Sequence, residues 1–118
     1  MRRNILDESH IHPAIRDTIA KNHADIVEEV KAAIAANNVV VAGMAQNPAV
    51  TKARRALDAA GIPYKYLKYG SYFGDWRRRN ALKMWTGWPT FPMVFVKGVL
   101  VGGSRDVRRL IESGELKR

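Results

Sequence analysis

The chain has 118 residues, a length that suits one domain and is too short for two ordinary ones. It carries 20 lysines and arginines against 11 acidic residues, so its formal net charge at pH 7 is +9. A positive field of this size favours anionic partners, whether nucleic acid, acidic protein or a small anion, and does not choose among them. The sequence contains no cysteine, which excludes disulfides, thiolate metal sites and cysteine nucleophiles.

The sequence contains no run of about 18 apolar residues, so it predicts no membrane span and no membrane partner. Its first eight residues carry charges where a signal peptide needs an apolar run, and we therefore expect a cytoplasmic protein. The composition changes near Asn22, because the preceding residues show weaker apolar periodicity. We expect an N-terminal helical extension over residues 1–21 and one domain over residues 22–118.

The first half of this domain predicts a helix, a strand and a second helix. Apolar residues recur at helical spacing over 26–34, and the continuous apolar run 39–42 is typical of a strand covered on both faces. The second helix begins after Asn47, because asparagine caps helices well and Pro48 suits the first helical position. Gly61 supplies the C-terminal stop of that helix.

The second half predicts two more helices and three more strands. Strands are expected over 64–67, 93–96 and 100–101, the last two joined by a turn at Lys97-Gly98, and helices over about 75–85 and from a Ser104 cap to Gly114. The first strand–helix–strand crossover should be right-handed and give a parallel pair, whereas the hairpin pair must be antiparallel. The pattern therefore predicts an α/β fold of the thioredoxin class, with a four-stranded mixed sheet flanked by helices.

Four segments, in order and correctly spaced, carry a family pattern. They are Val39-Val40-Val41 followed by Asn47-Pro48-Ala49-Val50-Thr51-Lys52-Ala53, then Trp88-Pro89-Thr90-Phe91-Pro92, then Val96-Lys97-Gly98 with Val101-Gly102-Gly103, and finally Ser113-Gly114-Glu115-Leu116. Over about residues 25–116 the chain resembles the glutaredoxin family. The Trp-Pro-Thr-Phe-Pro segment is similar to the monothiol branch, whose last proline is cis, whereas the short loop before Asn47 is similar to dithiol members. No branch is assigned.

The resemblance implies where a catalytic cysteine would lie. It places Asn47 at the position of the cysteine that attacks a glutathione mixed disulfide and Val50 at the resolving position. An amide cannot form a mixed disulfide, and neither Thr51 nor Ser71 has a base beside it that would activate its hydroxyl. The three histidines have no acidic or cysteine cluster to complete a metal site. We therefore predict no catalytic residue and no metal.

The resemblance also implies a glutathione groove, since binding needs no nucleophile. The residues that it assigns to the ligand are Arg79, Thr90, Phe91, Pro92, Gly103 and Ser104. The extended tripeptide would pair with the backbone before Pro92, its γ-glutamyl end would meet the amides of Gly103 and Ser104, and Arg79 would meet its glycine carboxylate. Arg78 or Arg77 is the alternative for the arginine, because the preceding segment is longer than usual in the family.

Two of the family's contacts with glutathione are replaced in this sequence. Met44 stands where the family has a lysine, and Arg105 stands where an aspartate meets the γ-glutamyl ammonium group. Removing one favourable charged contact commonly costs about 1.5–3 kcal/mol, and a facing like charge adds to that cost. We therefore expect no resident cofactor and a weakened affinity for glutathione.

Three functions are open at this point. The first is a non-catalytic binding module whose groove beside Phe91-Pro92 holds a small anion or an extended acidic peptide. The second is a nominal glutaredoxin in redox homeostasis, a variant or descendant of an active thiol–disulfide oxidoreductase. The third is a nucleic-acid or acidic-surface binder that uses Arg77-Arg78-Arg79 and neighbouring aromatic residues. For that arginine run the alternative is a solvated helix face with the aromatic residues turned inward.

Overall fold

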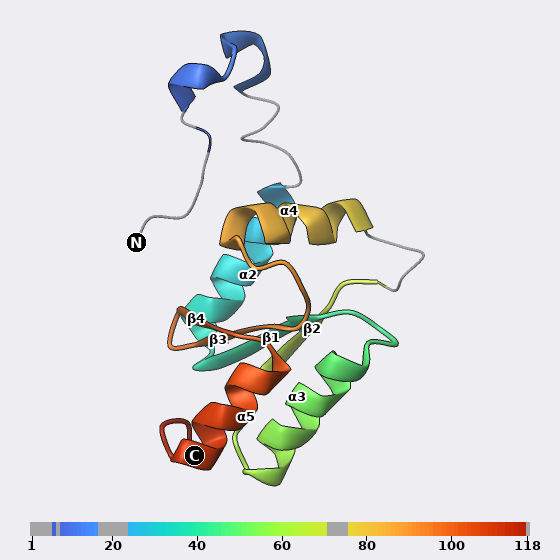
Figure 1. The fold of residues 1–118 in the computed structure, drawn as a ribbon, viewed down its shortest axis with the longest axis vertical. Coiled ribbons are helices and arrows are strands. Elements are labelled where there is room, and N and C mark those ends of the chain that lie inside the picture. Colours follow the sequence, from blue (N-terminus) through green and yellow to red (C-terminus); the bar gives the residue numbers. More distant parts are fainter. Residues whose placement is uncertain (1–5, 7, 17–23, 71–75, 118) are drawn as a thin grey trace.

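A computed structural model describes residues 6, 8–16, 24–70 and 76–117 of the chain. Its elements are η1 (Glu8–His10), α2 (Ala24–Ala36), β1 (Val39–Gly43), α3 (Pro48–Ala59), β2 (Lys65–Lys68), α4 (Trp76–Thr86), β3 (Met93–Val96), β4 (Val99–Gly102) and α5 (Ser104–Ser113). From α2 onward, these elements lie within one or two residues of the bounds expected from the sequence. Helices cover both faces of the sheet, with α2 and α4 on one side and α3 and α5 on the other (Figure 1).

The described strands form one mixed sheet in the order β2-β1-β3-β4. β1 pairs in parallel with β2 and antiparallel with β3, and the β3–β4 hairpin is antiparallel. Every residue of the central strand β1 is buried, which explains its unbroken apolar run. The predicted fold class, a four-stranded mixed sheet between helices, is confirmed.

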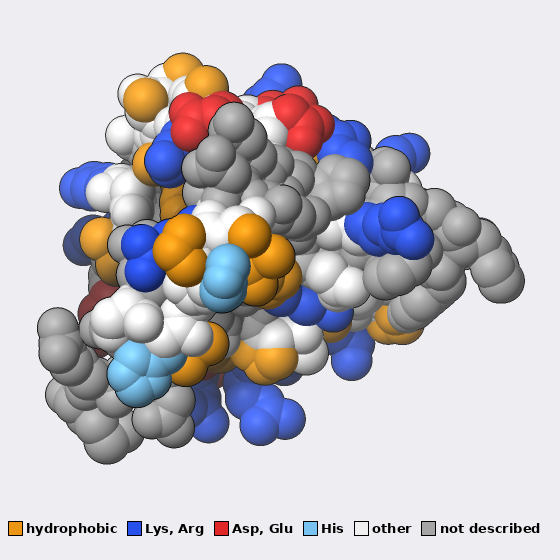
Figure 2. All heavy atoms as spheres, turned by 90° about the horizontal axis from the view of Figure 1, so that it is seen from above, with side chains coloured by type: hydrophobic (Ala, Val, Ile, Leu, Met, Phe, Trp, Pro, Cys, Tyr) orange, Lys and Arg blue, Asp and Glu red, His pale blue; other side chains and the backbone are white. Residues whose placement is uncertain are grey.

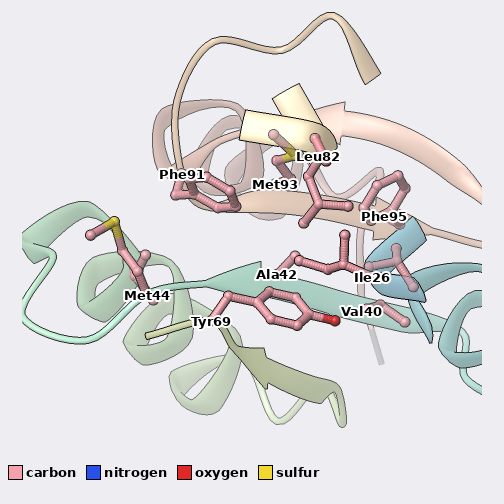
Figure 3. Packing of buried hydrophobic residues seen from close by; sticks show 12 residues of the cluster. Ile26, Val40, Ala42, Met44, Tyr69, Leu82, Phe91, Met93 and Phe95 are labelled. Carbon is pink, nitrogen blue, oxygen red and sulfur yellow. The ribbon is translucent and has the colours of Figure 1, made fainter. Parts of the chain in front are cut away.

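Side chains of β1 alternate between two apolar layers, as the two-residue period of a strand requires. Val40 and Ala42 belong to the layer under α2 and α4, and Val39 and Val41 to the layer over α3 and α5. In the first layer, Phe91, Met93 and Phe95 follow one another along the β3 segment and face Ile26, Val40, Ala42 and Leu82 (Figure 3). The second layer contains Leu57 of α3, Val94 of β3 and Val107 of α5. Both layers share the sheet as their common wall.

A buried tyrosine joins α2 and α4 to the end of β2. Tyr69 is 3% exposed, and its hydroxyl donates a hydrogen bond of 2.6 Å to Oε1 of Glu29. Burial first, and then this hydrogen bond, raise the pKa of Tyr69, so the hydroxyl keeps its proton and remains a donor. The guanidinium of Arg78 lies 5.6 Å from the centre of the tyrosine ring and pairs with Asp25 at 3.2 Å. These contacts fix α4 against α2.

The N-terminal extension is described only in part, as η1 and a helical turn at 13–16. Residues 17–23 lie outside the described residues, so the expected helix of the extension and the domain boundary near Asn22 stay predictions. No helix in the described ranges is long and apolar enough to cross a membrane.

The start of α3 confirms the predicted cap. Oδ1 of Asn47 accepts hydrogen bonds from the amides of Ala49 at 2.9 Å and Val50 at 3.2 Å, while Pro48 occupies the first turn. Two of the amides that a helix N-terminus leaves without a backbone partner are thereby satisfied. The side chain of Asn47 thus stabilises the helix that it precedes.

Leu57→Ala should lower the free energy of unfolding by about 2–5 kcal/mol, because Leu57 is fully buried and its truncation leaves a cavity. Urea unfolding followed by tryptophan fluorescence measures this change. The matched control is Leu6→Ala, the same substitution at a side chain that is 64% exposed. It should change the free energy by less than about 0.5 kcal/mol. Equal losses in the two variants would contradict the assigned core.

Asn47→Ala should cost about 0.5–2 kcal/mol of stability, because it removes the acceptor that caps α3. Asn47→Asp keeps an acceptor oxygen and adds a negative charge at the positive end of the helix dipole, so its stability should equal or exceed that of the parent. The two variants are compared by urea unfolding at pH 7. A loss of the same size in the aspartate variant would show that the cap is not what stabilises this position.

Candidate functional site

A groove of about 780 Å³ lies where α3, α5 and the segment before β3 meet. Its lining residues are Asn47, Pro48, Ala49, Lys52, Trp88, Thr90, Phe91, Pro92, Gly103, Ser104, Arg105, Asp106, Arg108 and Arg109. α3 and α5 lie side by side on one face of the sheet and run in the same direction (Figure 1). The first residues of both helices therefore line the same groove.

A close contact holds the start of α3 against the end of β1. A Cβ atom on Gly43 would lie 2.7 Å from Cγ1 of Val50, so glycine is required for the helix to approach the strand this closely. The carbonyl of Gly43 accepts a hydrogen bond of 2.8 Å from the amide of Tyr69, which ties the strand end to β2. Asn47 is consequently held at the edge of the groove.

The two positions that the family resemblance assigns to cysteines have different surroundings. Asn47 lines the groove and its side-chain oxygen caps α3. Val50 is 2% exposed and packs in the layer under α2 and α4, away from the groove lining. Neither side chain is a thiol, and neither ionises. What this end of α3 offers to a ligand is the positive end of a helix dipole and the amide group of Asn47.

The start of α5 differs from the prediction. Gly103, not Ser104, is the N-cap residue, and Ser104 is the first residue of the helix. The helix starts one residue earlier than a serine cap would allow, because Oδ2 of Asp106 reaches back and accepts a hydrogen bond of 3.0 Å from the amide of Gly103. Gly102 has φ of 114°, and a Cβ atom there would collide with the Asp106 carboxylate. Gly102 thus leaves room for the Asp106 carboxylate, and Gly103 supplies the amide that this carboxylate accepts from.

The segment before β3 forms the third wall of the groove. The Phe91–Pro92 peptide bond is cis. Phe91 is 6% exposed and packs in the core, whereas Thr90 is exposed. The amide of Trp88 donates a hydrogen bond of 3.1 Å to Oγ1 of Thr86, which itself donates to the carbonyl of Leu82 at 2.8 Å. This wall is therefore tied to the last turn of α4.

Two buried polar atoms at the groove have no hydrogen-bond partner among the residues that the structure describes. They are Nε1 of Trp88 and Oγ of Ser104. The indole nitrogen lies close to the α5 start, since a Cβ on Gly103 would be 3.7 Å from it. A buried donor that lacks a partner costs free energy, and an indole N–H can only donate. Both groups suit an acceptor on a bound ligand.

The charge that lines the groove is strongly positive. Lys52, Arg105, Arg108 and Arg109 are exposed cations, and none forms an ion pair with a described residue. Asp106 is the acidic residue of the lining, and its carboxylate is already bonded to the amide of Gly103. Two helix N-termini add to this field, because each carries partial positive charge. The field in the groove therefore attracts anions and repels cations.

Five of the six ligand residues expected from the sequence meet in this groove, and the sixth does not. Thr90, Phe91, Pro92, Gly103 and Ser104 are all lining residues. Arg79 is 6% exposed, and its Nη1 donates a hydrogen bond of 2.9 Å to the carbonyl of Tyr69. Arg79 instead holds α4 onto the end of β2, and it is not part of the lining.

Of the other residues that the resemblance places near the ligand, Arg105 lines the groove, whereas Met44, Arg77 and Arg78 do not. Arg105 lines the groove, as the resemblance implies, whereas Met44 is 6% exposed and packs in the layer under α2 and α4. Of the alternatives for Arg79, Arg78 pairs with Asp25, and Arg77 is exposed on α4 without lining the groove. Ser71 lies outside the described residues.

Lys52, Arg108 and Arg109 line the groove but are not among the residues expected from the sequence. One signal for them is present, because Arg105, Arg108 and Arg109 have the three- and four-residue spacing that places side chains on one face of a helix. That spacing cannot show that α3 lies beside this face. The contribution of Lys52 therefore depends on tertiary structure alone.

Basic side chains also occur far from the groove. Figure 2 shows the molecule from above relative to Figure 1. Lys and Arg side chains lie around the margin of this view, and most of the visible acidic side chains lie at one edge. The groove therefore does not hold all of the basic side chains of the described residues. What distinguishes the groove is the combination of cations with two helix N-termini and two unpartnered polar atoms.

Comparison with known proteins identifies relatives of this chain. A family model described as Glutaredoxin matches residues 39–101, more than half of the sequence. The Glutaredoxin-like protein of Dictyostelium discoideum is 46% identical over 102 residues, which cover 86% of this chain and 83% of that protein. Glutaredoxin 4 of Buchnera aphidicola is 28% identical over 96 residues, covering 80% of this chain and 90% of that protein.

Solved structures agree with these relatives. The crystal structure of oxidized glutaredoxin 2 from Chlamydomonas reinhardtii matches with a TM-score of 0.67 and 26% identity, over 79% of this chain and 88% of that one. The crystal structure of a buckwheat glutaredoxin–glutathione complex matches with a TM-score of 0.71 over 81% of this chain and 87% of that one, and at 24% identity it shows the fold alone. The fold is the thioredoxin fold, and the chain belongs to the glutaredoxin family.

Proposed function

We propose that this member of the glutaredoxin family is a non-catalytic binding protein whose groove holds an extended anionic ligand or an acidic peptide. The observation that carries the proposal is the meeting of four cationic side chains and two helix N-termini in one groove. The lining contains no thiol, because the sequence has no cysteine. The retained fold therefore supplies recognition without a group that exchanges with disulfides.

The shape of the groove supports an extended ligand. Thr90 is exposed immediately before the cis Phe91–Pro92 bond, and the backbone of Thr90 and Phe91 makes no hydrogen bond to the described residues. An extended chain can pair with such free backbone groups as an added strand does. Its carboxylates would then lie between the start of α5 and Lys52, where the positive charge is densest.

Glutathione is the first small molecule to consider, because it is bound in the buckwheat complex. In this chain the start of α5 suits a carboxylate, and Ser104 offers a hydroxyl as well as a first-turn amide. Arg105, however, adds a cation where the ligand's ammonium group would approach, and the buried Arg79 is bonded to the carbonyl of Tyr69 away from the groove. We therefore propose that an acidic peptide with a blocked amino terminus binds more tightly than glutathione.

Family membership favours a second candidate, a nominal glutaredoxin that descends from an active thiol–disulfide oxidoreductase. On that view, the glutathione pocket is intact and only the nucleophile is missing at Asn47. The two candidates differ in what a restored thiol would do, and this difference can be measured.

The nucleic-acid alternative has less support. Of the arginine run on α4, Arg79 is buried and Arg78 is paired with Asp25, so the three guanidinium groups do not form one solvated patch. Phe91 is buried and Trp88 is partly buried, which leaves little ring surface at the groove on which bases could stack.

Binding of acetylated, amidated tetraglutamate should weaken about two- to fivefold in Arg109→Gln, because one exposed charge contact with the ligand is lost. Isothermal titration calorimetry at low ionic strength measures the affinity. Arg55→Gln is the matched control, since Arg55 is an exposed cation on α3 that does not line the groove. Absence of heat, together with unshifted NMR signals from Thr90 to Ser104, would remove the proposal.

In the variant Asn47→Cys, the new thiol should have a pKa below the ordinary value of a cysteine, because the helix N-terminus and nearby cations stabilise a thiolate. Reductase activity toward a glutathionylated peptide should nevertheless stay near background, since Arg105 disfavours glutathione. Adding Arg105→Asp to Asn47→Cys should then raise that activity. Ala32→Cys, at an exposed site on α2, controls for an ordinary thiol. High activity in Asn47→Cys alone would favour the nominal glutaredoxin instead.

A further inference from the structure

We propose that the binding site continues beyond the groove, along a furrow between α3 and α5, and that its occupant is a protein segment with acidic residues next to apolar ones. This inference rests on the proposed function and names its partner class. The α3–α5 furrow is a second hollow of about 330 Å³, lined by Ala56, Ala59, Ala60, Arg108, Ile111 and Glu112.

The furrow and the groove are parts of one surface. Arg108 lines both of them. The groove lies at the N-terminal ends of α3 and α5, and the furrow lies further along the same two helices, which run side by side (Figure 1). A chain that leaves the groove in the direction of the helices therefore enters the furrow.

The chemistry of this surface changes along its length. On α3, Lys52 in the groove is followed on the same face by Ala56, Ala59 and Ala60 in the furrow. On α5, Arg105 and Arg108 are followed by the half-buried Ile111. Cations thus give way to small apolar side chains. The complementary partner carries carboxylates at one end and apolar side chains immediately beyond them.

The length of the surface favours a peptide over a small molecule. From Lys52 to Ala60 a helix rises by ~12 Å, at 1.5 Å per residue. An extended chain covers that distance in about four residues, at roughly 3.3 Å per residue. A peptide bound in the groove therefore needs about four further residues beyond Lys52 to reach the end of the furrow.

The same surface argues against nucleic acid as the occupant. A nucleic acid repeats its negative charge along its whole length, whereas in the furrow the cation Arg108 is accompanied by the acidic Glu112 and by apolar residues. No aromatic ring lines the furrow among the described residues, so bases would find nothing to stack on. An acidic segment followed by leucine or alanine fits both halves.

Acetylated, amidated peptides of three compositions test this inference on the full chain. They are tetraglutamate, tetraglutamate joined to Leu-Ala-Leu-Ala, and tetraglutamate joined to Gly-Ser-Gly-Ser, with each extension placed at either end. The apolar extension in one orientation should tighten binding by about tenfold over tetraglutamate, through apolar surface buried in the furrow. The glycine–serine extension should change affinity by less than about twofold. Oligo-dT of matched charge should bind no more tightly than tetraglutamate.

A pair of matched variants locates the gain. Ala59→Gln puts a polar side chain into the furrow at an exposed helical position and should abolish the tenfold gain while leaving tetraglutamate affinity within about twofold. Ala32→Gln, the same change at an exposed position on α2, should preserve the gain. Circular dichroism confirms that both variants fold.

The outcomes separate this inference from the proposed function. Two results would contradict binding in the furrow and leave the proposal for the groove intact. They are tetraglutamate binding with no gain in affinity from the apolar extension, and a gain in affinity that persists in Ala59→Gln. Tighter binding of oligo-dT than of the apolar peptide overturns the partner class. Absence of tetraglutamate binding would contradict the proposed function, and with it the inference about the furrow.

Discussion

The packing of α3 and α5 in parallel on one face of the sheet determines the electrostatics of this protein. Because both helices begin at the same edge, the positive ends of their dipoles converge on one groove (Figure 1). The convergence depends on close packing below it. Gly43 lets Val50 approach the end of β1, and Leu57 and Val107 bury the two helices in a shared apolar layer. Cations then add to a field that the backbone already creates.

Asn47 has a structural role at the start of α3. A residue at a helix N-terminus can act on a ligand or satisfy the helix itself, and the oxygen of Asn47 does the second by accepting two amide hydrogens. This is the place where the glutaredoxin resemblance puts a thiol. An amide at this position supplies no nucleophile, whereas the cations and helix N-termini of the groove are present, and the proposed binding without redox chemistry depends on that combination.

The parts of the structure that depend on local sequence could be predicted, and those that depend on tertiary contacts could not. The apolar run of β1 and the Asn47-Pro48 start of α3 are local signals, and the structure confirms both. The expected Ser104 cap was wrong, because the turn at Gly102 brings Asp106 back to the amide of Gly103.

Side chains whose positions depend on a neighbouring element were the hardest to place. The resemblance places Arg79 at the ligand, whereas in the structure its guanidinium donates a hydrogen bond to the carbonyl of Tyr69, ten residues earlier in the chain. Lys52 joins the groove only because α5 packs beside α3. Sequence spacing identifies which residues share a helix face, and it does not identify what that face meets.

Phe91 couples the shape of the groove to the core behind it. Phe91 lines the groove, yet its side chain packs in the opposite layer with Ile26, Leu82 and Met93 (Figure 3). One wall of the groove is therefore supported by core residues that do not themselves line the groove. Because close-packed interiors transmit changes in volume, substitutions in α2 and α4 can reshape the groove from behind.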